Sequence, residues 1–412
     1  MGHILNLIAE AYLFGQDSAS FEKEYKAAGA PARRQLWRQR GELGKLHNLV
    51  AHVMASGKRS ELFEELQKTW NQGKAMERSL KLVLDGGIRW NASYAMVTRA
   101  ILLRDALDRY ATKLRVSKDA FDMETYEEDY LNDDEWSTLE LISKQLEPLF
   151  HITKALEGNT KLTEGTGKPS HGALWEVLPA FEGLLAHFEA LERKAANGDF
   201  NERIQQSITL AWNKAKEYYV KTDVSVAWQA SLVLHPRWKW QYFEEKWTGL
   251  ERAYVTNGKK ALKQLWEKQY KSEPIIRQES ATPEPADQVD YLEAMLNGLA
   301  PTGAAPAVRS SSRRDQLTQY LEEPVSNTPL FLYWKSKQGQ WPQLSQMAFD
   351  FLAVPAMSSE CERVFSSCSK QTTQEVSRLS GEMLWRRECL KNWEHRGAIR
   401  MMSCYNAVWL GI

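Results

Sequence analysis

Residues 136–156 read WSTLELISKQLEPLFHITKAL, and this stretch decides the fold class of the chain. Apolar side chains recur in it at steps of three and four residues, at Trp136, Leu139, Ile142, Leu146 and Leu149. That spacing places them on one face of an α-helix. Amphipathic segments continue through 172–196 and 202–221, and the run from 136 to 270 shows almost no strand pattern. We therefore predict an all-α region here.

The part of the chain before this region is also predicted to be mainly helical. Helical spacing of apolar residues occurs over 3–14, 42–54, 60–78 and 93–114. Residues 82–84 form a short apolar run that ends in Asp-Gly-Gly, the clearest strand-and-turn signal in the sequence. The acidic stretch 122–135 is predicted to be a connector.

The composition changes after residue 271. Residues 272–314 hold five of the fourteen prolines together with scattered Ala, Ser, Thr and acidic residues. Such a stretch cannot bury much apolar surface, so we predict a flexible linker. Order is expected to resume over 315–396, which is denser in apolar and aromatic residues. The tail 397–412 is apolar without a clear period.

Charge and cysteine content exclude several classes of protein. The 412 residues include 53 Lys and Arg against 53 Asp and Glu, so contact with nucleic acid would need a local basic patch. The four cysteines lie near the C-terminus without CxxC spacing, which excludes a disulfide scaffold and argues against a zinc knuckle. No stretch approaches the roughly 20 apolar residues of a membrane span, so no membrane partner is expected. No P-loop, dinucleotide fingerprint or nucleophile elbow occurs.

A local basic patch is present at residues 33–40, which read RRQLWRQR. Arg33, Arg34, Arg38 and Arg40 flank a tryptophan, and each guanidinium offers a planar fork that matches phosphate. This composition fits a nucleic-acid-binding patch. A solvated helix face explains it equally well.

Two further segments carry residue types suited to chemistry. Asp85–Asn91 places a carboxylate before Arg89, Trp90 and an asparagine, a set able to bind a metal, a phosphate and a base, although a capped turn in which Trp90 packs is the simpler interpretation. Around Met357–Ser366, Glu362 either completes a capping box or holds a divalent cation together with ligands from elsewhere.

Four segments together resemble the C-terminal portion of hAT-superfamily DNA transposases of the fungal type. Gly2–Leu7 resembles the end of a CxxH-x-LNL segment, and Arg89–Tyr94 resembles a TRWNSxY motif, here with Ile in place of Thr. Val233–Phe243 resembles an LHPxxKWxYF stretch. Trp341–Ser366 resembles the C-terminal dimerisation region and is the most specific of the four.

The resemblance implies a fold that is mainly α, in which a long all-α insertion region is flanked by remnants of an RNase H-like α/β core. Residues 1–115 would be a partial core segment with the Arg-Trp motif, and 116–271 the insertion. Residues 315–396 would form the dimerisation region and the end of the core. A homodimer or larger oligomer is therefore expected, with DNA as a further partner and the nucleus as the location.

The resemblance also assigns roles to particular residues. Glu362 would be the one remaining acidic residue of the family's catalytic triad, with Mg²⁺ or Mn²⁺ as the cofactor of an intact transposase and none expected for this chain alone. Trp90 would stack on a flipped base with Arg89 near its phosphate. His3 would be the histidine of the CxxH pair.

Departures from the family pattern set the predicted function. In the family the zinc finger and both catalytic Asp residues precede the CxxH segment, inside which this sequence begins. Two-metal phosphoryl transfer needs several converging carboxylates. We therefore predict a truncated transposase relic that retains dimerisation and weak DNA binding without transposase activity. The alternative is an active cut-and-paste transposase whose missing part is unannotated or supplied in trans.

Overall fold

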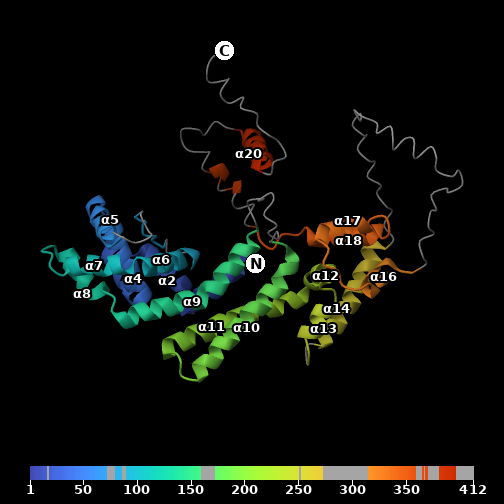
Figure 1. Cartoon of the computed structure of the whole chain (residues 1–412), viewed down its shortest axis with the longest axis horizontal. Coiled ribbons are helices and arrows are strands. Elements are labelled where there is room, and N and C mark those ends of the chain that lie inside the picture. Colours follow the sequence, from blue (N-terminus) through green and yellow to red (C-terminus); the bar gives the residue numbers. More distant parts are fainter. Residues whose placement is uncertain are drawn as a thin grey trace, which may run out of the picture. The chain divides into compact units, whose positions relative to one another are not determined.

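The computed structural model describes residues 1–15, 18–71, 79–85, 90–158, 172–249, 252–271, 314–358, 364–365, 367–369 and 380–395. Within these ranges the chain is helical and contains no strand (Figure 1). The predicted mainly α class is confirmed. The strand predicted at 82–84 is wrong, because residues 79–85 have no regular secondary structure. The side chain of Gln67 bonds both the N–H and the carbonyl of Leu80, in place of a neighbouring strand.

The chain forms two compact units. Unit 1 contains Met1–Gly172, Pro179–Lys221 and Met357–Ile412, and unit 2 contains Ala173–Leu178 and Thr222–Ala356. The division predicted near residue 115 therefore falls inside unit 1. Of the predicted linker 272–314 only Arg314 is described, and the tail 397–412 lies outside the described residues.

Unit 1 is helical, and several of its helices share an apolar core. Its helices are α1 (Gly2–Phe14), α2 (Ser18–Ala27), α3 (Ala30–Arg38), α4 (Glu42–Met54), α5 (Gly57–Asn71), α6 (Trp90–Leu102), α7 (Arg104–Leu114), α8 (Ala120–Asp129), α9 (Asp133–Leu156), most of α10 (Val177–Ala196), α11 (Glu202–Val220) and α20 (Gly381–His395). Helix α4 packs against α3, α5, α8 and α9, and α1 packs against α11 and α9. Trp136 and Leu139 of α9 lie in this core together with five apolar residues of α4, namely Leu43, Leu46, Leu49, Val50 and Val53.

Local sequence accounts for the ends of these helices. Asn132 and Glu135 form a capping box at the start of α9. The helix predicted over 93–114 is interrupted at Leu103, and the segments on either side are α6 and α7. The acidic stretch 122–135, predicted as a connector, contains most of α8 and the first turn of α9. Helix α8 begins after Asp119, whose carboxylate accepts two backbone N–H groups of the first turn.

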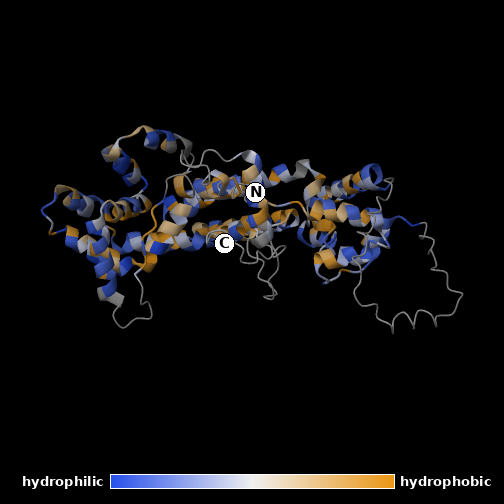
Figure 2. Ribbon diagram, turned by 90° about the horizontal axis from the view of Figure 1, so that it is seen from above, coloured by the Kyte–Doolittle hydropathy of each residue, from blue (hydrophilic) through white to orange (hydrophobic). Residues whose placement is uncertain are grey.

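Unit 2 joins two segments that are distant in the sequence. Its elements are η2 (Leu174–Glu176), part of η3 (Lys221–Val224), α12 (Val226–Val233), α13 (Gln241–Lys246), α14 (Arg252–Leu265), η4 (Trp266–Tyr270), α16 (Gln316–Glu322), α17 (Leu330–Lys337) and α18 (Pro342–Leu352). Tyr320 donates to the carbonyl of Val233 (2.8 Å) and the Trp334 indole to that of Leu234 (2.9 Å). Most helices carry both apolar and polar residues (Figure 2).

Candidate nucleic-acid interface

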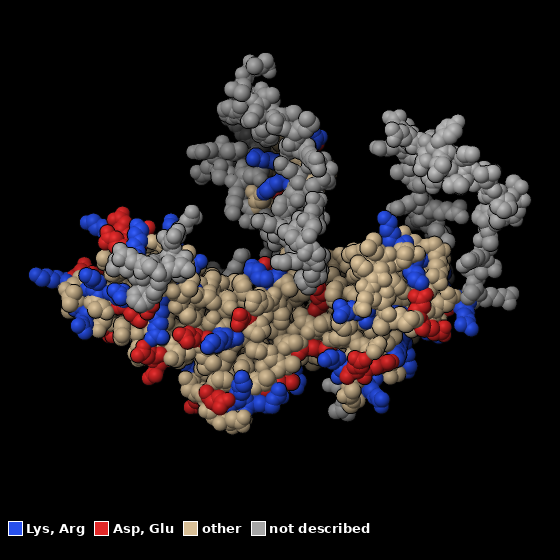
Figure 3. All heavy atoms as spheres, viewed as in Figure 1, with Lys and Arg blue, Asp and Glu red and all other residues tan. Residues whose placement is uncertain are grey.

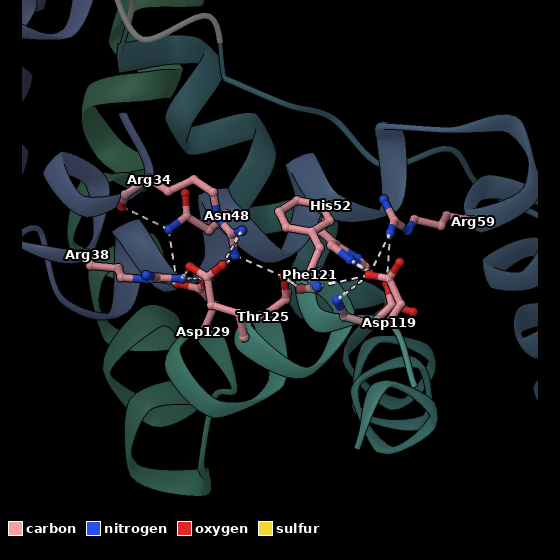
Figure 4. Close-up of polar contacts among 11 residues, drawn as sticks. Arg34, Arg38, Asn48, His52, Arg59, Asp119, Phe121, Thr125 and Asp129 are labelled. Atoms are coloured by element: carbon pink, nitrogen blue, oxygen red, sulfur yellow. Dashed lines mark hydrogen bonds and ion pairs between the residues drawn. The ribbon is translucent and has the colours of Figure 1, made fainter. Parts of the chain in front are cut away.

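Two arginines of the predicted basic patch, Arg34 and Arg38, lie on α3 and face the acidic helix α8 (Figure 4). Arg38 Nε donates to Asp129 Oδ1 (2.9 Å) and its Nη2 to Oδ2 (2.8 Å), a two-pronged pairing. Arg34 Nη2 donates to the same Oδ2 at 3.0 Å. The Asp129 side chain is fully buried. The hydrogen bond with Asp129 is the main reason that the pKa of Arg38 is raised.

Neighbouring groups complete this cluster. Asn48 of α4 donates to Asp129 Oδ1 (3.0 Å), and the Thr125 hydroxyl accepts from Arg34 Nη2 (2.9 Å). Glu124, about half exposed, pairs with Arg38 at 3.0 Å. The ring of Phe121 lies between the guanidinium groups of Arg34 (4.4 Å) and Arg59 (5.0 Å). The cluster therefore joins α3, α4 and α5 to α8.

The other two arginines of the patch also bind groups within unit 1. Arg33 Nε donates to the carbonyl of Tyr25 (3.0 Å) and its guanidinium lies 5.1 Å from the Tyr25 ring. Arg40 Nη1 donates to the carbonyl of Phe14 (2.7 Å) and lies 4.3 Å from the ring of Phe21. These contacts use part of each guanidinium, and Arg33 is exposed. The arrangement supports a structural role for all four arginines, and their contact with DNA stays a prediction.

A second polar group lies on the same side of α8. His52 is buried, with Nδ1 at 3.0 Å from the Tyr110 hydroxyl and Nε2 at 3.0 Å from Asp122. Arg59 pairs with Asp122 at 2.8 Å. Burial lowers the pKa of His52 to about 4, so the imidazole is neutral near pH 7.

Asp85 has a packing role in this structure, whereas the residues that directly follow it lie outside the described residues. Asp85 is buried, with one carboxylate oxygen at 2.5 Å from His47 Nδ1, while the other accepts from the Ser93 hydroxyl (2.8 Å). The indole of Trp37 stacks on His47, with ring centres 3.9 Å apart. Both oxygens of Asp85 are thus engaged by side chains from α4 and α6.

Only some of the residues to which the family resemblance assigned a role are among the described residues. Trp90 is 2% exposed at the start of α6, so in this conformation its ring is covered by protein and not open to a base. Arg89 and Glu362 lie outside the described residues, and His3 is exposed on α1. Among the described residues no group of three or more His, Cys, Asp or Glu side chains is arranged to hold a metal ion.

Sequence reasoning missed an apolar stripe on α20. Met383, Leu390 and Trp393 are each about half exposed. Together with the exposed Arg386 they follow one another at steps of three, four and three residues. Residues at these steps share one face of a helix. The apolar members are seven and three residues apart, and Arg386, which pairs with Glu382, lies between Met383 and Leu390 on the same face. Apolar residues repeated along one face are typical of a helix that packs on a partner.

Comparison with known proteins matches both ends of the chain. Residues 316–394 match the model of the hAT family C-terminal dimerisation region, and residues 1–145 match the ZBED1 RNase-like helical domain. The second match agrees with the absence of strands among the described residues of this segment. No helix in the described parts is long and apolar enough to cross a membrane.

The curated relatives are distant in sequence. A putative AC transposase of Zea mays is 21% identical over 85% of this chain and 41% of its own length. A putative transcriptional regulator, tpeD, of Talaromyces stipitatus is 23% identical over 79% of the chain and 32% of that protein. The zinc finger BED domain-containing protein RICESLEEPER 2 of Oryza sativa subsp. japonica is 23% identical over 86% and 48%. The chain spans less than half the length of these relatives.

Proposed function

We propose that this chain, which is similar to hAT-type transposases, acts as a dimerising module that pairs with a second copy through residues 316–394, the segment matched by the hAT C-terminal dimerisation region. The observation that carries the proposal is the apolar stripe on α20, defined by Met383, Arg386, Leu390 and Trp393. It lies within the matched dimerisation region. Exposed Met, Trp and Arg side chains are also the types enriched at protein interfaces.

The anchoring of α20 supports this orientation of the stripe. The Glu388 carboxylate accepts from the Ser367 hydroxyl at 2.8 Å, and Lys391 Nζ donates to the same hydroxyl at 2.7 Å. At 100° per residue, Glu388 and Lys391 lie on a different face from Leu390 and Trp393. The helix is therefore held by one face while the stripe stays exposed.

Oligomeric state tests the proposal directly. We expect the full chain to be dimeric in sedimentation equilibrium, and Leu390→Glu or Trp393→Ala to weaken the dimer at least tenfold. A buried charge or a missing aromatic anchor removes that much affinity from an interface. Trp385→Ala is the matched control, because Trp385 is exposed on another face of α20.

Circular dichroism shows whether each variant keeps its helix content. Dimers unchanged by both stripe substitutions would rule out the stripe as the contact.

A second candidate function is metal-dependent cleavage of DNA strands, favoured by the resemblance of Trp341–Ser366 to the family motif around Glu362. Several carboxylates converge on the ions in such chemistry, and Glu362 would supply one of them. A nuclear location would follow from this activity. Incubation with a DNA hairpin and Mg²⁺ or Mn²⁺ tests it: nicking that Glu362→Gln abolishes supports cleavage, and nicking at equal rate in both proteins contradicts it.

A further inference from the structure

The stripe on α20 is too small to hold a stable dimer alone. Met383, Leu390 and Trp393 expose 51%, 42% and 48% of their surface. With roughly 150–250 Å² for a large aromatic side chain, these three offer about 300 Å² of apolar surface. A specific interface takes about 800 Å² from each partner. Another surface must therefore contribute to the dimer that the proposed function requires.

An exposed apolar surface of this kind lies on α17 and α18, at the other end of the matched dimerisation region. We call it the Phe331 surface and define it by Phe331 and Leu332 of α17 and Phe349 of α18. Phe331 and Leu332 are 53% and 60% exposed, and the rings of Phe331 and Phe349 stack in parallel with centres 6.4 Å apart. Figure 3 shows a largely uncharged area over α17 and α18. Adjacent solvent-facing aromatic and aliphatic side chains are typical of a binding surface.

The remaining side chains of α17 make this surface rigid. Trp334 is buried and bonds the carbonyl of Leu234, while the Tyr333 hydroxyl donates to Glu323 Oε2 at 3.0 Å. Lys337 pairs with the same carboxylate at 2.7 Å. These contacts fix the inner face of α17 to the rest of unit 2. Phe331 and Leu332 are consequently held outward without a further cost in ordering the backbone.

We propose that the Phe331 surface of one copy receives the α20 stripe of a second copy. The inference rests on the proposed function and specifies its contact. In a two-fold symmetric dimer this contact occurs twice, because each copy offers both surfaces. The two contacts bury four apolar surfaces, so each copy contributes its Phe331 surface in addition to its stripe. Met383 and Trp393 would then pack on the stacked rings of Phe331 and Phe349, a favourable sulfur–aromatic and aromatic environment.

Complementary charges introduced into the two surfaces test this pairing. We expect Leu332→Lys alone and Leu390→Glu alone each to weaken the homodimer at least tenfold in sedimentation equilibrium. An equimolar mixture of the two variants should form a dimer again, within about threefold of the original affinity. In that heterodimer one contact joins the new lysine to the new glutamate, and the other keeps both leucines.

The outcomes separate this inference from the proposed function. If Leu390→Glu breaks the dimer while Leu332→Lys does not, the α20 stripe is the contact and the Phe331 surface is not its partner. Two monomeric variants that fail to re-form a dimer on mixing overturn the pairing. If neither substitution weakens the dimer, both proposals fail. Phe331→Ala is a second, uncharged probe of the Phe331 surface. We expect it to weaken the dimer while its thermal unfolding stays unchanged.

Discussion

Asp129 holds three side chains at once, and its contribution to stability should far exceed that of Glu124 on the same helix. Asp129→Ala leaves Arg34, Arg38 and Asn48 without their shared buried acceptor. Removing one partner of a buried ion pair costs about 3–5 kcal/mol. Glu124→Ala, the matched control at a half-exposed carboxylate, should cost less than about 1 kcal/mol. Urea unfolding of the three proteins measures both; equal midpoints for the two variants would contradict the assigned roles.

The pairing of these residues could not be predicted from the sequence. The basic run at 33–40 and the acidic run at 122–135 are both evident in the sequence. Nothing local indicates that they meet, since Arg38 and Asp129 are 91 residues apart. A patch that looks free in a sequence is therefore paired in the folded chain.

At the scale of elements, the spacing of apolar residues predicted the helices well. The many acidic residues of 122–135 led to a wrong prediction, because that stretch is largely helical and not a connector. Helix α4 has the predicted bounds, and α1 begins one residue before them. The acidic stretch lacks a strong apolar face, so its helix α8 depends on tertiary ion pairs that no spacing reveals. The apolar run 82–84 resembles a strand because burial alone also selects such residues, and Leu82 lies in the helical core.

The segment 233–243, first noticed for its resemblance to a family motif, contacts α16, which follows it by about 80 residues in the same unit. Lys239 is the non-glycine residue with positive φ (48°) among the described residues. Its buried ammonium donates to the carbonyls of Tyr320 and Glu323 at the C-terminal end of α16. Free carbonyls at a helix end need such donors. The motif thus fixes the first helix of the matched dimerisation region onto α12 and the turn after it.

At the scale of the whole molecule, a buried histidine with a lowered pKa in each unit should make both units sensitive to acid. His52 in unit 1 faces Tyr110, Asp122, Arg59 and Arg34, and burial lowers its pKa to about 4. In unit 2, burial also lowers the pKa of His235 to about 4, beside Arg237 and the rings of two tryptophans. The ordinary histidine pKa is about 6.5.

The sign of the effect follows from proton uptake. Between pH 6.5 and 4 the unfolded chain protonates both histidines while the folded chain does not, so stability is complete above pH 6.5 and falls toward pH 4. Each histidine contributes up to about 3 kcal/mol to this loss. The lowered pKa of Asp122 places that residue's own contribution at a lower pH.

Urea unfolding at several pH values between 7.5 and 4.5 measures the number of protons taken up on unfolding. Near pH 5 we expect His52→Gln and His235→Gln each to take up about one proton fewer than the original protein, and the double variant about two fewer. Additivity is expected because the two histidines lie in separate units and share no partner. An unchanged pH slope in either single variant would show that its histidine is charged in the folded state, and so is not desolvated as its burial requires.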